Sequence, residues 1–165
     1  MITRYKYPRT LHLPFSLGRS NDDKVLDSLD HFIGKEVVIT EKMDGECTTL
    51  YPDYYSHARS IDSKNHPSRD WIKSFHSEIA HKMLPGFRIC GENLYARHSI
   101  GYDNLDSFFY GFSLWHTSPE GVDWCFSWDS TQEYFEELGI ISVPKIWRGI
   151  FDEKIVRALA AGTDA

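Results

Sequence analysis

The chain has 165 residues, of which 41% are hydrophobic and 25% charged, and its net charge is −6. This length and composition are those of one folded domain with a hydrophobic core, and no apolar run approaches the roughly 20 residues of a membrane span. The acidic balance excludes a protein that grips nucleic acid by overall positive charge, so a nucleic-acid role would depend on a local basic patch.

The first predicted elements are a short helix and two strands. An Asn or Asp within residues 21–23 can cap a helix through residues 25–32, which Gly34 would close. VVIT (37–40) and CTTLY (47–51) follow, and both are rich in the β-branched and aromatic residues that strands prefer.

The most strongly predicted helix comes next. SHARSID (56–62) leads to it as an extended piece or a loop, and Pro67 with Ser68 opens it. Pro85-Gly86 ends it. Apolar residues recur every four positions along one face of this helix, at Trp71, Phe75, Ile79 and Met83.

The central part of the chain predicts further extended pieces. They are FRICGEN (87–93), a second piece around LYARHSI (94–100), and FFYGFSLW (108–115). TSPEGVD (117–123) predicts a turn, and WCFSW (124–128) predicts a strand after it.

The last part predicts two helices around a short extended piece. Ser130 with Glu133 fits a capping box for a helix that Gly139 would end. ISVPKIW (141–147) contains a proline typical of a sheet edge, and Asp152 can cap a final helix. The elements together predict one domain over residues 1–165, of the α+β class, with a largely antiparallel sheet flanked by helices.

The cysteines bear on the cellular compartment. Cys47, Cys90 and Cys125 are odd in number and form no CxxC pair, which argues against a disulfide framework and a cysteine zinc site. The N-terminus lacks the apolar stretch of a secretory signal. Both observations favour a reducing, cytoplasmic location.

The stretch VVITEKMDGECTTLY (37–51) is the most informative in the chain. It places Lys42 two residues before Asp44-Gly45 and between two predicted strands. Asp-Gly between strands is a strong hairpin signal, because glycine accepts a positive φ in a tight turn. On this evidence alone, Lys42 is an exposed lysine of a hairpin.

Lys-x-Asp-Gly at a strand end also resembles the nucleophile motif of the covalent nucleotidyltransferases, which include ATP-dependent DNA ligases, RNA ligases and mRNA capping enzymes. In that family the lysine attacks the α-phosphate of a nucleotide and holds the nucleotide as a phosphoramide. Only a neutral amine can attack, whereas a free lysine is almost wholly protonated at neutral pH. Such a site therefore needs desolvation or nearby positive charge, including Mg²⁺ brought with ATP.

Three further segments follow in the order that the family has. SHARS (56–60) resembles the segment whose arginine contacts the nucleotide or the nucleic-acid end. RICGENLYARHSI (88–100) resembles the one whose Gly-Glu supplies a carboxylate to the ribose, and FFYGFSLW (108–115) the strand whose aromatic residue stacks on the purine. The combination looks most like the RNA ligase 2-like branch, since DNA ligases usually carry an arginine where this chain has Cys47.

The resemblance implies a role for each matched residue. Lys42 would be the nucleophile that becomes linked to AMP. The other matched residues would bind the nucleotide: Glu41 at the adenine edge, Asp44 and Gly45 in the turn, Arg59 on phosphate or ribose, Glu92 on ribose and Phe112 on adenine.

Simpler roles stay open for single residues. Glu92 also fits a surface carboxylate and Arg59 an ordinary ion-pair partner, which contributes only about 0–1 kcal/mol. Phe112 also fits the core, and Phe108 or Tyr110 could face the same way.

The resemblance further implies a nucleotidyltransferase domain with an ATP-grasp-like ligase fold. It implies an ATP-dependent RNA ligase that forms lysyl-AMP and seals 5′-phosphate to 3′-hydroxyl RNA ends. ATP and Mg²⁺ would be its cofactors, without an assignable metal-binding residue. Its partners would be ATP or AMP and the ends of nicked or broken RNA, without a membrane.

Two C-terminal motifs of the family do not occur, namely a Glu-Gly for the catalytic metal and a strand with paired lysines. Glu120-Gly121 comes too early, and Lys145 and Lys154 are not spaced as that strand. Losing one preorganised donor typically costs ~10²–10³ in rate. We therefore expect an adenylyltransferase domain truncated at its C-terminus. The alternatives are a fragment that binds nucleotide or RNA ends without catalysis, an assembly piece, and half of a split ligase whose open sheet edge pairs with a partner chain.

Overall fold

The computed structural model describes residues 3–17, 20–63 and 66–162. The chain divides into two compact units. Unit 1 contains residues 1–7 and 41–144, and unit 2 contains residues 8–40 and 145–165.

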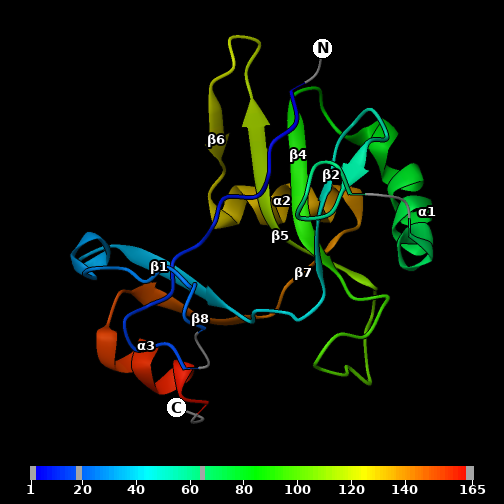
Figure 1. Cartoon of the computed structure of the whole chain (residues 1–165). Coiled ribbons are helices and arrows are strands. Elements are labelled where there is room, and N and C mark those ends of the chain that lie inside the picture. The colour runs from blue at the N-terminus through cyan, green and yellow to red at the C-terminus, as the bar shows by residue number, and fades with distance from the viewer. Residues whose placement is uncertain (1–2, 18–19, 64–65, 163–165) are drawn as a thin grey trace. The chain divides into compact units, whose positions relative to one another are not determined.

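Unit 1 is built on a six-stranded sheet (Figure 1). Its main path runs in the order β3 (Ser56–His57), β2 (Glu46–Leu50), β4 (Phe87–Asn93), β5 (Phe109–Thr117) and β6 (Asp123–Cys125), with every neighbouring pair antiparallel. The short β7 (Ile141–Ser142) adds one parallel pair near the start of β5. The predicted α+β class with a largely antiparallel sheet is therefore confirmed.

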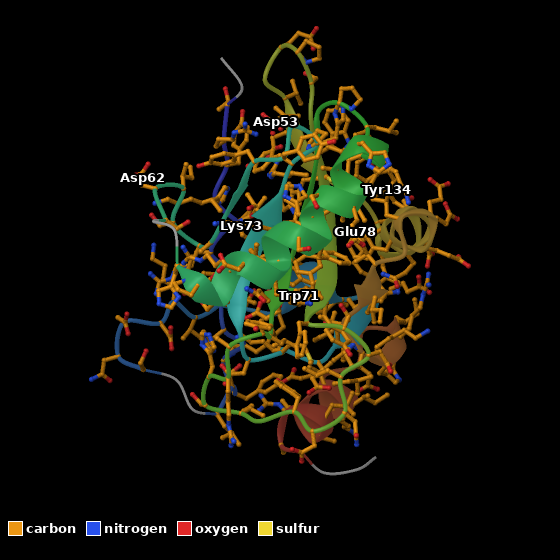
Figure 2. The ribbon with its side chains drawn as sticks, turned by 90° about the vertical axis from the view of Figure 1, so that its right-hand side faces the viewer. Asp53, Asp62, Trp71, Lys73, Glu78 and Tyr134 are labelled. Atoms are coloured by element: carbon orange, nitrogen blue, oxygen red, sulfur yellow. The ribbon has the colours of Figure 1, made fainter. Side chains whose placement is uncertain are left out.

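Helices cover one face of this sheet. η2 (Pro67–Arg69), α1 (Asp70–Ile79) and η3 (Ala80–Lys82) form one helical stretch, which Figure 2 shows from the front, and α2 (Trp128–Leu138) lies behind the strands in Figure 1. The four-residue recurrence predicted this stretch, because it places apolar side chains on the sheet. The resulting core comprises Leu50, Ile72, Ile79, Met83, Ile89, Phe109, Leu114, Tyr134, Phe135, Leu138 and Ile140.

The opposite face of the sheet carries polar and aromatic groups. Because successive residues of a strand point to opposite faces, the core position of Ile89 puts Arg88, Cys90 and Glu92 on the other side. We call this side, defined by these three residues, the front face. Residues 4–7, dark blue in Figure 1, run along it, and the Tyr5 N–H donates to the Tyr51 hydroxyl (3.0 Å).

Unit 2 is centred on an antiparallel pair of strands, β1 (Glu36–Thr40) and β8 (Lys145–Ile150). The short η1 (Asp30–Phe32) precedes β1, and α3 (Glu153–Ala160) follows β8. The Asp152 side chain accepts hydrogen bonds from the first backbone N–H groups of α3, so the predicted cap is confirmed. No helix of the described ranges is long and apolar enough to cross a membrane.

The predicted hairpin around Asp44-Gly45 is wrong. Both strands form, but β1 pairs with β8 in unit 2, whereas β2 pairs with β3 and β4 in unit 1. Asp-Gly makes a hairpin turn only where the flanking strands pair with each other. Gly45 also lacks the positive φ of such a turn, which Gly34 and Gly86 have. Residues 41–45, which belong to unit 1, are instead the connection along the chain between β1 and β2.

The predicted helix over residues 25–32 is also wrong, apart from η1. The His12 N–H donates to the Lys24 carbonyl (2.8 Å), and the Leu26 N–H donates to the His12 carbonyl (2.8 Å). His12 and Val25 thereby form a parallel bridge. These bonds use the backbone groups that a helix would need.

Three boundaries differ from the prediction. LYARHSI (94–100) is a loop rather than an extended piece, and residues 141–147 divide at Pro144 into β7 and β8. Residues 124–128 divide too, because α2 begins at Trp128. Its cap is Ser127, whose hydroxyl accepts the Ser130 N–H (3.2 Å), rather than Ser130.

Candidate functional site

Lys42 lies on the connection of residues 41–45. Its side chain and that of Glu41 are exposed, and the Glu41 N–H donates to the Pro144 carbonyl (2.8 Å). Met43 is only 5% exposed, and it packs in a cluster with Leu94, Tyr110 and Val143. Lys42 is therefore an exposed amine held beside a buried anchor. We call this group of four residues the Met43 cluster.

Hydrogen bonds fix the backbone that follows Lys42. The Asp44 N–H donates to the Tyr102 hydroxyl (2.8 Å), and the Asp44 carboxylate accepts the Ile100 N–H (2.8 Å). The Gly45 N–H donates to Glu92 Oε1 (3.1 Å). The loop after β4, together with Glu92 near the end of β4 itself, therefore holds this segment in place.

Strands β2 and β4, together with the bend that follows β3, bring Cys47, Glu92 and Arg59 near one another, and we call these three residues the row. Cys47 lies opposite Glu92 in the register of β2 and β4. Arg59 comes two positions after His57, the last residue of β3, and lies in a bend. The charges of Arg59 and Lys42 both act on the Cys47 thiol, and Lys42 also acts on Glu92. Residues far apart in the sequence therefore meet at one place on the front face.

The acidic and thiol groups of this row are largely buried. Burial raises the pKa of the Glu92 carboxyl, while the Gly45 N–H, Lys42 and His98 act in the opposite direction. Burial also raises the pKa of Cys47 to about 12, so its thiol stays protonated at neutral pH. A protonated thiol is a poor nucleophile, so Cys47 is not a candidate for a reactive thiolate.

Replacing Glu92 with glutamine is expected to raise the free energy of unfolding at neutral pH. The variant removes a buried charge and keeps an oxygen that can accept the Gly45 N–H. Because the pKa of Glu92 is raised on folding from 4.5, wild type loses stability as pH rises from that value through the raised one, and the variant does not.

Denaturant unfolding of both proteins between about pH 4 and about pH 8 checks this expectation. The two free energies of unfolding should converge at the acid end and separate as pH rises. A difference that stays constant over the whole range would contradict the assignment to Glu92.

A β-bulge brings Phe112 to the same face. In the register of β4 and β5, Gly91 pairs with Gly111 and Cys90 pairs with Ser113, so Phe112 is an extra residue. Bulges re-aim side chains and are frequent beside active sites. The simple alternation of a strand does not predict this orientation.

The neighbours of Phe112 settle which aromatic residues of this strand share its surroundings. Phe112 packs against the Met43 cluster, to which Tyr110 itself belongs. Phe108 contacts the rings of Trp71 and Tyr95 instead, and its ring centre is 5.3 Å from the centre of each. Of the three aromatic residues Phe108, Tyr110 and Phe112, Phe112 is therefore the half-buried one that packs against the Met43 cluster.

Gly45 is required by a close approach between strands. A Cβ atom there would lie 2.5 Å from the Asn93 carbonyl oxygen and 2.7 Å from Leu94 Cδ2. Gly45→Ala is expected to push the start of β2 away from β4 and to cost about 1–3 kcal/mol of stability. Denaturant unfolding measures this cost.

A matched control is Gly101→Ala, where the added methyl meets only the flexible guanidinium of Arg97 (2.8 Å). This control should stay close to wild type. Equal stability of the two variants would show that the approach at Gly45 is not tight.

Several residues of the site have no signal in the sequence. Tyr102 bonds a residue 58 positions away, and His98 and Met43 act through packing and charge that only the folded chain reveals. A tyrosine two residues beyond a resembling segment is not distinctive by itself.

No group of three or more His, Cys, Asp or Glu residues is placed to hold a metal ion within the described ranges. Two carboxylates of the site, those of Asp44 and Glu92, each already accept a backbone N–H. Magnesium is usually held by one or two carboxylates together with water and substrate phosphates. The residues present therefore fit a metal that arrives with phosphate better than a resident metal.

Comparison with known proteins adds one match. The model of the RNA ligase family matches residues 35–164, which is most of the chain and includes the whole row together with Lys42 and Phe112. No curated protein sequence matches the chain.

Proposed function

Because the chain belongs to the RNA ligase family, we propose that it is an ATP-dependent RNA ligase or the adenylyltransferase part of one. Family membership supports RNA-ligase-type activity in general. The finer proposal is that Lys42 carries AMP covalently, and that residues 1–165 act as one adenylyltransferase-like domain.

One observation carries the proposal. An exposed lysine lies on a backbone fixed by three hydrogen bonds, beside a row that contains an arginine and a buried carboxylate. Such a combination suits a nucleotide, because the arginine can bind phosphate and the carboxylate can accept from ribose hydroxyls. A row of this kind is hard to explain as structure alone, since burying Glu92 costs stability.

The proposed roles follow the chemistry of each side chain. Glu92 would accept hydrogen bonds from the ribose, and Arg59 would bind phosphate or ribose. Phe112 would stack on the adenine, with Glu41 at its edge. Asp44 and Gly45 would hold Lys42 in place through the bonds described above.

The proposed reaction has three steps. The neutral Lys42 amine attacks the α-phosphorus of ATP, a P–N bond forms, the bond to the β-phosphate breaks, and pyrophosphate leaves. The 5′-phosphate of RNA then attacks the same phosphorus and releases the lysine. Finally a 3′-hydroxyl attacks the activated 5′-phosphate, a phosphodiester forms, and AMP leaves.

Magnesium would supply charge neutralisation on the phosphates of ATP. Asp44 and Glu92 would be the carboxylates available to assist in holding it. This chain's own contribution would be to orient the nucleotide and to keep the Lys42 amine next to the α-phosphate.

The test is incubation with Mg²⁺ and ATP labelled in its α-phosphate, followed by denaturation. The label is expected to stay with the protein, whereas ATP labelled in its γ-phosphate should leave none, because pyrophosphate departs. Added pyrophosphate should remove the α-label. Nucleotide binding by calorimetry without a covalent label would instead identify a binding fragment, and no binding at all would overturn the proposal.

A further inference from the structure

The N-terminal segment of residues 4–7 is fastened to the front face of the sheet in unit 1. The Arg4 guanidinium forms an ion pair with Asp53 through two hydrogen bonds. It also lies over the rings of Tyr51 and Tyr55, 4.4 and 4.3 Å from their centroids. Paired and stacked in this way, Arg4 fixes one end of the segment.

The next residue extends the attachment. Tyr5 donates its N–H to the Tyr51 hydroxyl, which in turn donates to the Tyr5 carbonyl (3.3 Å). The Arg88 guanidinium lies 5.0 Å from the centre of the Tyr5 ring. The segment is therefore a fixed part of this face, not a tail that passes over it.

Tyr7 lies at the far end of the segment, against the proposed adenine-stacking residue. Its ring centre is 4.9 Å from that of Phe112, with an interplanar angle of 75°, and 6.3 Å from that of Trp115 at 90°. Both are edge-to-face contacts, which aromatic rings prefer to flat stacking without offset. The hydroxyl of Ser113 also interacts with the Tyr7 hydroxyl, whose pKa burial raises to about 12, so Tyr7 is neutral there.

The position of Phe112 explains why it needs such a neighbour. As the extra residue of a bulge, it lacks the cross-strand partner that holds the side chains of regular strand residues. It is half-buried, so the core constrains only part of its ring. An edge-to-face contact from a fixed segment supplies the missing constraint.

We propose that Tyr7 is a positioning residue for the nucleotide base, which holds the Phe112 ring in the orientation that stacks on adenine. The inference rests on the proposed function, and it goes beyond the family assignment because Tyr7 lies outside the matched residues 35–164. It predicts that ATP affinity depends on Tyr7, although Tyr7 does not itself touch the reacting atoms.

The test is self-adenylylation measured over a range of ATP concentrations in the full chain. Tyr7→Ala is expected to raise the ATP concentration for half-maximal rate by about three- to ten-fold, which is the size expected for one aromatic pair. The limiting rate should change by less than about two-fold, because the amine and the phosphate contacts are untouched. Tyr7→Phe keeps the ring and should lie close to wild type.

Two controls separate positioning from a damaged fold. Tyr54→Ala removes an exposed tyrosine whose ring contacts His76 rather than Phe112, and it should leave the ATP dependence unchanged. The reverse reaction of adenylylated protein with pyrophosphate should keep its pyrophosphate dependence in Tyr7→Ala, since pyrophosphate has no base. If Tyr7→Ala does not fold, Tyr7→Leu fills most of the space without an aromatic ring and should show the same ATP defect.

The outcomes are distinct. An unchanged or lower half-saturating ATP concentration in a folded Tyr7→Ala or Tyr7→Leu protein would overturn the inference, and the lower value would mean that Tyr7 obstructs the base. Wild-type protein that takes no label would overturn the proposed function instead.

Discussion

Lys42→Ala is expected to lower covalent labelling by ATP by at least about 10³-fold, to background. Labelling requires an amine that can attack the α-phosphorus, and the alanine variant has none at this position. Lys42 is exposed, so its loss should leave the free energy of unfolding almost unchanged. A gel of the denatured protein after incubation with α-labelled ATP measures the effect.

Two further variants sharpen this result. Lys42→Arg keeps the positive charge but not a group that loses its proton, so it should bind ATP and still take no label. Lys82→Ala removes another exposed lysine of unit 1 and should label like wild type. Labelling of Lys42→Ala at the wild-type level would show that another residue is the nucleophile.

The largest loss of stability is expected for Arg88→Ala. Arg88 is only 2% exposed, and it forms two hydrogen bonds with the Asp123 carboxylate, at 2.6 and 2.8 Å. Its guanidinium also lies over the rings of Tyr5 and Trp115, 5.0 and 4.9 Å from their centres. The variant leaves Asp123 without this partner and opens a hole under the N-terminal segment. We expect a loss of about 3 kcal/mol, the lower end for a buried pair, because Asp123 is 23% exposed.

Denaturant unfolding checks this value, and Arg157→Ala is the matched control. Arg157 pairs with Glu153 on the surface of α3, where an ion pair contributes less than about 1 kcal/mol. If Arg88→Ala cost no more than Arg157→Ala, Arg88 would not be the anchor that the contacts indicate.

The loss at Arg88 should also depend on pH in a definite direction. The hydrogen bonds from Arg88 hold the pKa of Asp123 below its ordinary value of 3.8. A lowered carboxyl pKa contributes stability that is present above the unfolded value and is lost as pH falls through the folded one. The difference between wild type and Arg88→Ala should therefore shrink on strong acidification.

Local sequence patterns predict a helix of this fold well where the pattern of its own residues determines that it forms. The four-residue recurrence at Trp71, Phe75, Ile79 and Met83 predicts the helical stretch around α1, because those side chains must reach the core. Asp152 predicts the start of α3 for an equally local reason, since its carboxylate satisfies free N–H groups.

The partner of a strand is set by residues far away in the chain, and local sequence patterns do not predict it. Asp44-Gly45 predicts a hairpin between β1 and β2, but in the structure β1 pairs with β8. The helix expected over residues 25–32 is lost for the same reason, because His12 takes the backbone bonds of its first residues. The sequence of a strand does not reveal which distant strand it will pair with.

The candidate site divides in the same way. The sequence identifies the candidate reactive residues, because the motifs that contain them follow one another in the order of the family. These residues are Lys42, Arg59, Glu92 and Phe112. The bulge that turns Phe112, the Tyr102 bond and the attachment of Tyr7 arise only from folding. The supporting residues of a site can therefore be identified only from the structure, even where the candidate reactive residues can be identified from the sequence.

The central claim is that Lys42 carries AMP, and peptide mapping by mass spectrometry tests it most directly. After incubation with ATP and Mg²⁺, the intact protein should gain the mass of one adenylyl group, located on the peptide that contains Lys42. The bond should be lost in acid and kept in base, as expected of a phosphoramide. An adenylyl group on any other residue, or none on protein that binds ATP, would contradict the account.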